Sequence, residues 1–409
     1  MRRGEGIEPR RDERAMTVPR TERTREQFLP FAAPLMGEEE VAGVVECVRS
    51  GWLTTGLKVR EFEQAFAAAI GCRHALAVNS CTAALHLALE AVGVAEGDEV
   101  ITSPMTFTAT AAVIEHLRAR PVFVDCQPDT LNLDPGQLGA ALSPRTKAIV
   151  PVHFAGQACD LDAIRGVVRP RGIPVVEDAA HALPTRYRGQ LIGTLGELTC
   201  FSFYATKNLT TGEGGMVVTD HDRYAERVRL MHLHGMSHDA WKRYLEAGSW
   251  AYEVLAPGFK YNLSDRAAAI GLPQLRRLDA FHARRRAIAR RYHQAFAGLE
   301  AIRVPAAADE ASHAWHLYVI QLELGALRID RDQFIRELTR RNIGVSVHFI
   351  PLHIQPYYRD RYHYAPGDFP RAFRAFQRIL SLPIYAKMTD HDVEDVINAV
   401  TDIAEDHRR

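Results

Sequence analysis

The sequence predicts an α/β protein in which a large layered domain is followed by a smaller α+β domain. Two observations support this prediction. From HALAVNS (74–80) onward, short runs rich in valine and isoleucine alternate with helical patterns, which is typical of layered domains with buried parallel strands. Beyond about residue 276, strands and helices follow each other in a different rhythm.

The elements of the large domain can be placed in order. Amphipathic patterns predict helices over Glu38–Ser50 and Val59–Ile70. Helical patterns follow in CTAALHLALEAVG and TATAAVIEHL. The predicted strands are HALAVNS, DEVITSP, RPVFVD, AIVPVHF and IPVVEDAA, and then FSFY and MVV on the two sides of a glycine-rich turn.

The chain divides into three parts by composition. Residues 1 to about 27 are rich in arginine and glutamate and predict a disordered tail. Residues 28–275 form the predicted large domain. Residues 276–409 form the predicted small domain, which opens with a long helical stretch and continues through HLYVIQLE.

Bulk properties exclude several classes of protein. The 409 residues include 50 Lys+Arg and 50 Asp+Glu, so no overall charge draws the protein to nucleic acid or to an anionic membrane. No stretch approaches the roughly 20 apolar residues of a membrane span. The six cysteines are scattered without a CxxC pair, which argues against a disulfide scaffold or zinc ribbon and suits a cytoplasmic protein.

Polar residues occupy two strand ends of the predicted sheet, where ligands of open α/β sheets bind. Cys81 and Thr82 begin a helix, and the unpaired amides of a helix N-terminus attract phosphate. Asp178 ends a strand, and His181 follows three residues later. Each feature has an ordinary structural explanation: a helix cap, a loop acid and a core histidine.

Lys207 lies between two predicted buried strands, after Ser202 and before the turn Gly212–Gly215. A lysine held there either has a charged partner or is retained for its chemistry. A helix-end phosphate site, a strand-end aspartate and a desolvated lysine together suit pyridoxal 5′-phosphate (PLP). PLP needs an amine for its aldehyde and a carboxylate for its ring nitrogen. Phe107 lies in a strand-to-helix loop and is a candidate to stack on the ring.

At this point the chain resembles the DegT/DnrJ/EryC1/StrS sugar aminotransferases, from about residue 28 to residue 409. The resemblance implies the aspartate-aminotransferase-like fold type I, with a mixed, mostly parallel sheet. It is carried by several motifs in fixed order: SCTAALHLALEAVGVAEGDEVITSPMTFTATA, VVEDAAHA, FSFYATKNLTTGEGGMVVT, GFKYNLSDRAAAIGLPQL and SVHFIPLH.

The resemblance implies a role for each matching residue. Lys207 would form the Schiff base with PLP, Asp178 would pair with the pyridinium nitrogen, and His181 would lie near the cofactor hydroxyl. The phosphate would be held by Ser202, Thr82 and the Cys81 amide, with Phe107 stacked on the ring. Asn262 would reach the phosphate of a neighbouring subunit, which implies a homodimer with shared active sites. Two positions depart from the common pattern: many relatives have Gly or Ala for Cys81 and glutamine for His181.

The resemblance also implies the reaction. A branch of the family that dehydrates sugars has histidine at the lysine position, so Lys207 favours transamination. We expect an amino group to pass from L-glutamate to C4 of a UDP- or dTDP-linked 4-ketosugar, giving a 4-amino sugar nucleotide. The expected contacts to the sugar nucleotide are His348, His353, Trp241, Lys242 and Arg243, although packing or interface roles account for them equally well.

Five alternatives remain open or are set aside. C3 amination of a 3-ketosugar and amination of a cyclitol ketone would use the same cofactor residues. A PLP-binding regulatory protein is disfavoured by the complete cofactor set. A dinucleotide-binding dehydrogenase would need GxGxxG where the chain reads VNSCTAAL. The histidines His232, His234, His348 and His353 lack the spacing of a metal site.

Overall fold

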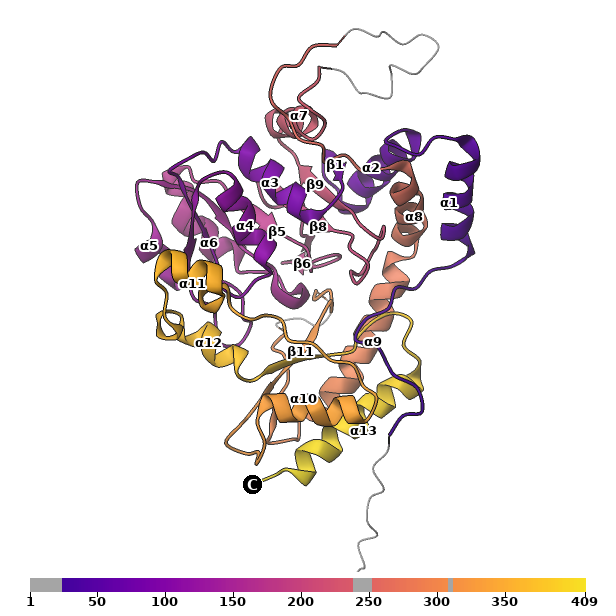
Figure 1. The fold of residues 1–409 in the computed structure, drawn as a ribbon, viewed down its shortest axis with the longest axis vertical. Helices are drawn as coiled ribbons and strands as arrows, with labels where there is room; N and C mark the ends of the chain where they lie inside the picture. The colour runs from indigo at the N-terminus through magenta and orange to yellow at the C-terminus, as the bar shows by residue number, and fades with distance from the viewer. Residues whose placement is uncertain (1–23, 238–251, 308–311) are drawn as a thin grey trace, which may run out of the picture.

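The structure of the chain is a computed structural model that describes residues 24–237, 252–307 and 312–409. Helices surround a central sheet in the upper part of the molecule, and a second, smaller group of strands and helices lies below it (Figure 1). None of the described helices is both long enough and apolar enough to cross a membrane.

The central sheet is mixed. Four strands lie in the order β1-β9-β8-β5, and three parallel strands lie in the order β3-β2-β4. Parallel bridges join Ile149 to Val175 and Val152 to Asp178, so β4 continues the sheet into β5. Among the described strands of this central sheet, β1, β9 and β8 pair antiparallel and the others pair parallel, which confirms the predicted mixed, mostly parallel sheet. The strand bounds are β1 His74–Val78, β2 Glu99–Thr102, β3 Arg120–Phe123, β4 Thr146–Val150, β5 Val176–Asp178, β8 Leu198–Ser202 and β9 Gly215–Thr219.

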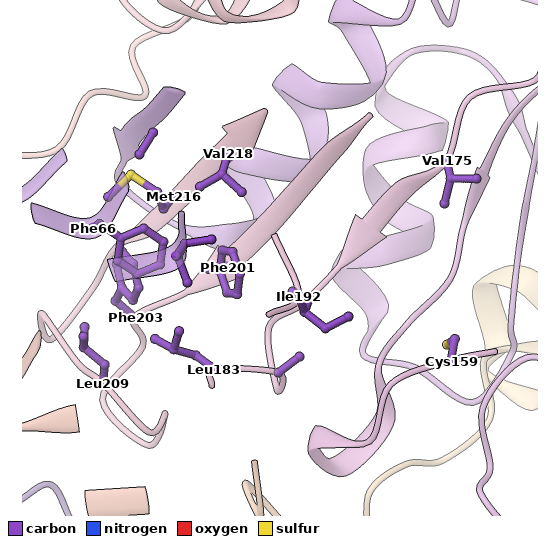
Figure 2. Packing of buried hydrophobic residues seen from close by; sticks show 14 of the residues in the cluster. Phe66, Cys159, Val175, Leu183, Ile192, Phe201, Phe203, Leu209, Met216 and Val218 are labelled. Atoms are coloured by element: carbon purple, nitrogen blue, oxygen red, sulfur yellow. The ribbon is translucent and has the colours of Figure 1, made fainter. Parts of the chain in front are cut away.

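Hydrophobic clusters cover both faces of this sheet, as parallel strands require. On one face, Phe62 and Phe66 of helix α2 (Leu57–Ile70) pack edge to face against Phe201 and Phe203. The ring centroids in these contacts between helix and sheet are 5.3–5.4 Å apart. Figure 2 shows Phe66, Phe201 and Phe203 gathered beside Met216. Helix α3 packs against the opposite face through Leu85, among others.

The helices of the large domain begin and end close to their predicted positions. The predicted helix over Glu38–Ser50 is confirmed as α1, and the next one begins at Leu57, two residues before the predicted start. Both end at a glycine in the left-handed conformation. The bounds are α1 Glu38–Ser50, α2 Leu57–Ile70, α3 Cys81–Ala91, α4 Thr108–His116, α5 Leu138–Ala141, α6 Leu161–Val168, α7 Asp222–Met231 and α8 Asp265–Arg276, with a short hairpin of β6 Arg186–Tyr187 and β7 Gln190–Leu191.

The C-terminal part has its own sheet, in the order β10-β11-β12, and its own core. Tyr292, Trp315 and Tyr318 are fully buried there. Its sheet and helices are consistent with the predicted α+β domain, and its division from the large domain at residue 276 stays a prediction. The bounds are α9 Leu278–Phe296, β10 Ile302–Arg303, β11 Tyr318–Leu322, α10 Arg331–Arg340, α11 Pro356–Tyr362, α12 Pro370–Phe376, β12 Ile379–Leu382 and α13 Asp390–Asp406.

The N-terminal segment packs on this C-terminal part. Within the predicted tail, residues 1–23 lie outside the described residues, whereas Arg25 forms ion pairs with Asp392 and Asp395. Leu29 follows in a parallel bridge with Ile343. The chain is therefore anchored at Arg25, slightly before the predicted end of the tail.

Candidate active site

A cavity of about 490 Å³ lies where β5 and β8 end and where α3 and α4 begin. Its volume is that of a typical small-molecule site. The structure brings eight of the sequence-predicted residues together in its lining: Cys81, Thr82, Phe107, Asp178, His181, Ser202, Lys207 and His348.

Of the five other predicted residues, the structure describes two, and both lie outside this lining. Asn262 lines a separate cavity of about 620 Å³ and donates to Thr55 Oγ1 over 2.6 Å. His353 is fully buried with its ring against Phe369, at a centroid distance of 4.9 Å. The predicted contacts Trp241, Lys242 and Arg243 lie outside the described residues.

Lys207 lies in the turn between β8 and β9, and its side chain is partly exposed to the cavity. Burial lowers the pKa of its amine to about 8, although the nearby Cys81 thiol and Asp178 carboxylate act in the opposite direction. About a tenth of the lysine is therefore neutral at pH 7. A neutral amine is the form that attacks a carbonyl.

The glycines after Lys207 let β9 approach the start of α3. A Cβ at Gly215 would lie 2.6 Å from the Ser80 carbonyl carbon and 2.7 Å from the Cys81 nitrogen. Gly212 has a φ of +81°, which favours glycine. The tight turn that GEGG predicts is therefore confirmed, and any side chain at position 215 would displace the helix end that faces the cavity.

The N-terminus of α3 offers donors for an anion. Ser80 caps the helix by accepting from the Ala83 amide over 3.1 Å, which leaves the preceding amides of Cys81 and Thr82 without intrahelical partners. The hydroxyls of Thr82 and Ser202 line the same cavity. The Cys81 thiol is turned toward the Cys200 carbonyl, 3.6 Å away. Amides, hydroxyls and the positive end of the helix dipole fit a phosphate group.

Asp178 lies at the end of β5 and is only 5% exposed. Its Oδ2 accepts from Thr110 Oγ1 over 2.7 Å, and its Oδ1 accepts from the Ala180 amide over 3.1 Å. Burial raises the pKa of the carboxyl, while these two hydrogen bonds and the charge of Lys207 lower it. A carboxylate with unused lone pairs at a cavity wall fits a protonated ring nitrogen.

The histidine tautomers follow from their partners. Nδ1 of His181 accepts from the Ala155 amide over 3.2 Å, so the ring proton is on Nε2. Asn208 donates to the carbonyls of Leu183 and Ala314 over 2.9 and 2.8 Å. Its oxygen therefore faces Nδ1 of His316 at 3.1 Å, which places that proton on Nδ1. His181 is a donor at Nε2 and His316 is an acceptor at Nε2.

All three cavity histidines are neutral near pH 7. Burial lowers the pKa of His181 and of His316 well below 6.5, and Lys207 adds to the effect. Burial likewise lowers the pKa of His348 to about 4, and its Nδ1 is 2.8 Å from Ser381 Oγ. Neutral imidazoles recognise hydroxyl groups rather than supply charge.

Aromatic rings line the entrance side of the cavity. Phe107 is the N-cap residue of α4 and is 60% exposed. Phe349 is stacked on His181, with centroids 5.9 Å apart and an interplanar angle of 18°. An exposed phenyl ring on a cavity wall is available to stack on a flat ligand.

Sequence reasoning missed several residues of this cavity. Thr106 lies in the bend before α4 and Thr110 in the first turn of that helix, and no local sequence pattern marks either hydroxyl as a partner of Asp178. Asn208 does not line the cavity, but it directly follows Lys207 and sets the tautomer of His316, and its place beside the lysine was an available signal. His316 and Phe349 come from the C-terminal part of the chain, and no local pattern connects them to Lys207.

Comparison with known proteins gives the family. The model of the DegT/DnrJ/EryC1/StrS aminotransferase family matches residues 34–401. The chain is 54% identical over 380 residues to the spore coat polysaccharide biosynthesis protein SpsC of Bacillus subtilis, covering 93% of this chain and 98% of that protein. The chain belongs to the DegT/DnrJ/EryC1/StrS aminotransferase family. Membership in this family confirms the resemblance that the sequence motifs indicated.

Solved structures of the family agree with the fold. The protein Spr1654 from Streptococcus pneumoniae, in its PMP-form, superposes with a TM-score of 0.87 at 35% identity, covering 92% of this chain and 99% of that one. It is also solved in a PLP-form. DesI, in the presence of its TDP-sugar product, gives a TM-score of 0.82 at 32% identity, covering 93% and 94%.

The protein is thus a PLP-dependent sugar aminotransferase of fold type I. Its cavity fits the cofactor on chemical grounds: an amine at Lys207, a carboxylate at Asp178, and a helix end that Gly215 leaves open. Among the residues that the structure describes, no group of three His, Cys, Asp or Glu side chains is arranged to hold a metal ion.

Proposed function

We propose that the enzyme transfers the amino group of L-glutamate to C4 of a UDP- or dTDP-linked 4-ketosugar, giving a 4-amino sugar nucleotide. The observation that carries the proposal is the lysine with a lowered pKa, which shares one cavity with Asp178 and with neutral histidines. The relative DesI, solved with its TDP-sugar product, supports a nucleotide-linked acceptor.

In this proposal Lys207 acts twice. Its neutral amine would hold the cofactor through the aldehyde, and, once displaced by the incoming amino group, the freed amine would carry a proton between the substrate carbon and the cofactor. PLP supplies the electron-withdrawing ring that makes this proton acidic. Asp178 holds the ring nitrogen in its protonated form through a charge-assisted hydrogen bond. Since both half-reactions use one lysine, the two substrates bind in turn.

The sugar contacts are the histidines of the cavity. His348 lines the cavity with a neutral ring, and His316 presents an acceptor nitrogen that matches a sugar hydroxyl. Trp241, Lys242 and Arg243 stay in the proposal as contacts to the diphosphate or base. His353 stays in it only as a residue behind the cavity, since its ring is packed on Phe369.

We also propose a homodimer in which Asn262 reaches the cofactor phosphate of the partner subunit. In one chain Asn262 lies beside the end of β1, bridged to Val78, and lines a cavity other than that of Lys207. Helix α1 carries an exposed apolar stripe of Val41, Val45 and Val48, which is the kind of surface that a subunit contact covers. Molecular mass in solution tests this proposal.

An absorbance experiment tests the proposed reaction. The purified protein with PLP should be yellow, lose that colour with L-glutamate, and regain it when a UDP- or dTDP-4-ketosugar is added. NMR of the product then gives the aminated carbon. Amination at C3, or recovery of the colour only with a cyclitol ketone, would replace the C4 proposal. A yellow protein that does not respond to any amino donor would indicate a regulatory PLP-binding protein.

A further inference from the structure

A short chain of hydroxyl groups lies behind Asp178. Thr110 Oγ1 is 2.7 Å from Asp178 Oδ2, and Thr106 Oγ1 is 2.8 Å from Thr110 Oγ1. Thr106 and Thr110 are each 1% exposed. Both residues also line the cavity, so the row of hydroxyl groups runs from the cavity wall to the carboxylate.

The direction of these hydrogen bonds is fixed by counting protons. A hydroxyl has a single proton to donate. Thr110 donates its proton to the carboxylate, so Thr106 must donate to Thr110. A donor that itself accepts a hydrogen bond is polarised and binds an anion more strongly. The two threonines therefore act as one donor to Asp178.

Asp178 depends on such donors because its surroundings disfavour charge. Burial raises the pKa of this carboxyl. The groups that face it are Lys207 from the turn after β8, His153 from the segment after β4, and the thiols of Cys81 and Cys200. His153 is itself bonded to Glu177 through Nε2, at 2.8 Å. Lys207 becomes engaged with the cofactor, so the Ala180 amide and the Thr110 hydroxyl are the constant donors.

We propose that Thr110, supported by Thr106, is a positioning residue that holds the Asp178 carboxylate charged and oriented toward the PLP ring nitrogen. Oδ2 is fixed by Thr110 and Oδ1 by the Ala180 amide. With one oxygen held from each side, the carboxylate cannot rotate freely and its remaining lone pairs face the cavity. The inference rests on the cofactor and not on the sugar proposed above.

Three variants and a control test this role. Thr110→Val removes the hydroxyl at nearly constant shape, Thr110→Ser restores it, and Thr106→Val removes only the second hydroxyl. Thr199→Val is the matched control, since Thr199 is 1% exposed in β8 and its hydroxyl has no hydrogen-bond partner among the described residues. The readouts are the PLP dissociation constant of the dialysed and retitrated protein, its unfolding midpoint without PLP, and the single-turnover rate constant and half-saturating concentration for the half-reaction with L-glutamate.

We expect Thr110→Val to weaken PLP binding about tenfold, as loss of a hydrogen bond to a charged group predicts, and to lower the single-turnover rate constant with L-glutamate more than it changes the half-saturating concentration. Thr106→Val should weaken binding about threefold, and Thr110→Ser and Thr199→Val should stay within about twofold of the natural protein. The unfolding midpoint without PLP should fall far less than PLP binding does.

Two results would overturn the proposal. Unchanged PLP binding in Thr110→Val would show that the hydroxyl is not needed. Equal losses in Thr110→Ser and Thr110→Val would show that restoring the hydroxyl does not restore PLP binding, and would assign the effect to packing around position 110 instead. If Thr110→Val does not fold, the test relies on Thr106→Val and Thr110→Ser. Wild-type PLP binding in Thr106→Val would then contradict the proposed role of the two hydroxyls. No sugar is used, so failure here leaves the proposed acceptor unaffected.

Discussion

The floor and the rim of the cavity are built differently. We define the floor as Cys81, Asp178, Ser202 and Lys207, and the rim as Phe31, Phe107, His348 and Phe349. Among the floor residues, Asp178 and Ser202 end strands, Cys81 begins a helix, and Lys207 lies in the turn between β8 and β9. Among the rim residues, Phe107 is a helix cap and Phe31 belongs to the N-terminal segment. His348 and Phe349 lie in the loop before the 3₁₀ helix Leu352–Ile354.

This difference between floor and rim indicates which half of the site is held in place by the fold. Asp178 is held by two donors and lies at the end of a buried strand. Phe107, in contrast, is 60% exposed and meets Phe349 only at a centroid distance of 6.3 Å. A floor that is fixed suits a permanent cofactor, whereas a rim that is loosely packed suits variation among substrates. Substitutions should therefore affect the floor more than the rim.

Lys207→Ala should have the largest effect. Removing the amine takes away both the bond to the cofactor and the proton carrier, so the rate constant of the half-reaction with L-glutamate should fall by at least about a thousandfold. The measurement is a single-turnover assay with L-glutamate, followed by absorbance. Lys387→Ala, at an exposed lysine of the C-terminal part, should keep full activity. Substantial turnover by the Lys207→Ala enzyme would show that the reaction does not depend on this floor residue.

The pH dependence of cofactor binding should be the next largest effect. Burial lowers the pKa of Lys207 to about 8, and only the neutral amine attacks PLP. The rate of PLP capture by the cofactor-free protein should therefore rise about tenfold per pH unit below 8 and level off above it. Stopped-flow absorbance between pH 6 and 10 measures this rate. A rate that continues to rise toward pH 10.5 would show an ordinary, solvated lysine.

The sequence could predict the floor because local patterns place it. Asp178 and Lys207 each lie beside an apolar run, and a strand end fixes where its last side chain lies. The glycines after Lys207 gave the turn. Thr110 escaped prediction because a buried threonine in a helix has the same appearance whether or not it bonds a carboxylate.

The rim was predicted only in part: the sequence indicated Phe107 and His348, whereas Phe31 and Phe349 come from segments that no local pattern connects to the cavity. His316 and Phe349 reach the cavity only through packing of the C-terminal part against the large domain. The same limit applies to His353, which the motif placed near the sugar but which lies against Phe369. Asn262 is a third case, because its proposed role needs a second subunit that no pattern within one chain describes.

Gly215→Ala tests whether the floor depends on close packing. The added Cβ would lie 2.6 Å from the Ser80 carbonyl carbon, so the start of α3 must move. We expect a loss of about 1–3 kcal/mol in the free energy of unfolding and weaker PLP binding. Denaturant unfolding and PLP titration measure the two effects. Gly139→Ala is the control, because its Cβ would meet no heavy atom within 4 Å among the described residues.

Phe107→Ala should give the smallest effect, and it tests whether the rim contributes to cofactor binding. Stacking of an aromatic ring contributes about 0.5–1.5 kcal/mol beyond burial, so PLP binding should weaken about threefold to tenfold. Because the ring is largely exposed, the free energy of unfolding without cofactor should hardly change. Phe28→Ala removes a ring that is 57% exposed outside the cavity and should leave PLP binding unchanged. If Phe107→Ala weakened PLP binding as much as Gly215→Ala, the rim would belong to the cofactor site as fully as the floor does. If it changed only the KM of the sugar, Phe107 would be a substrate contact.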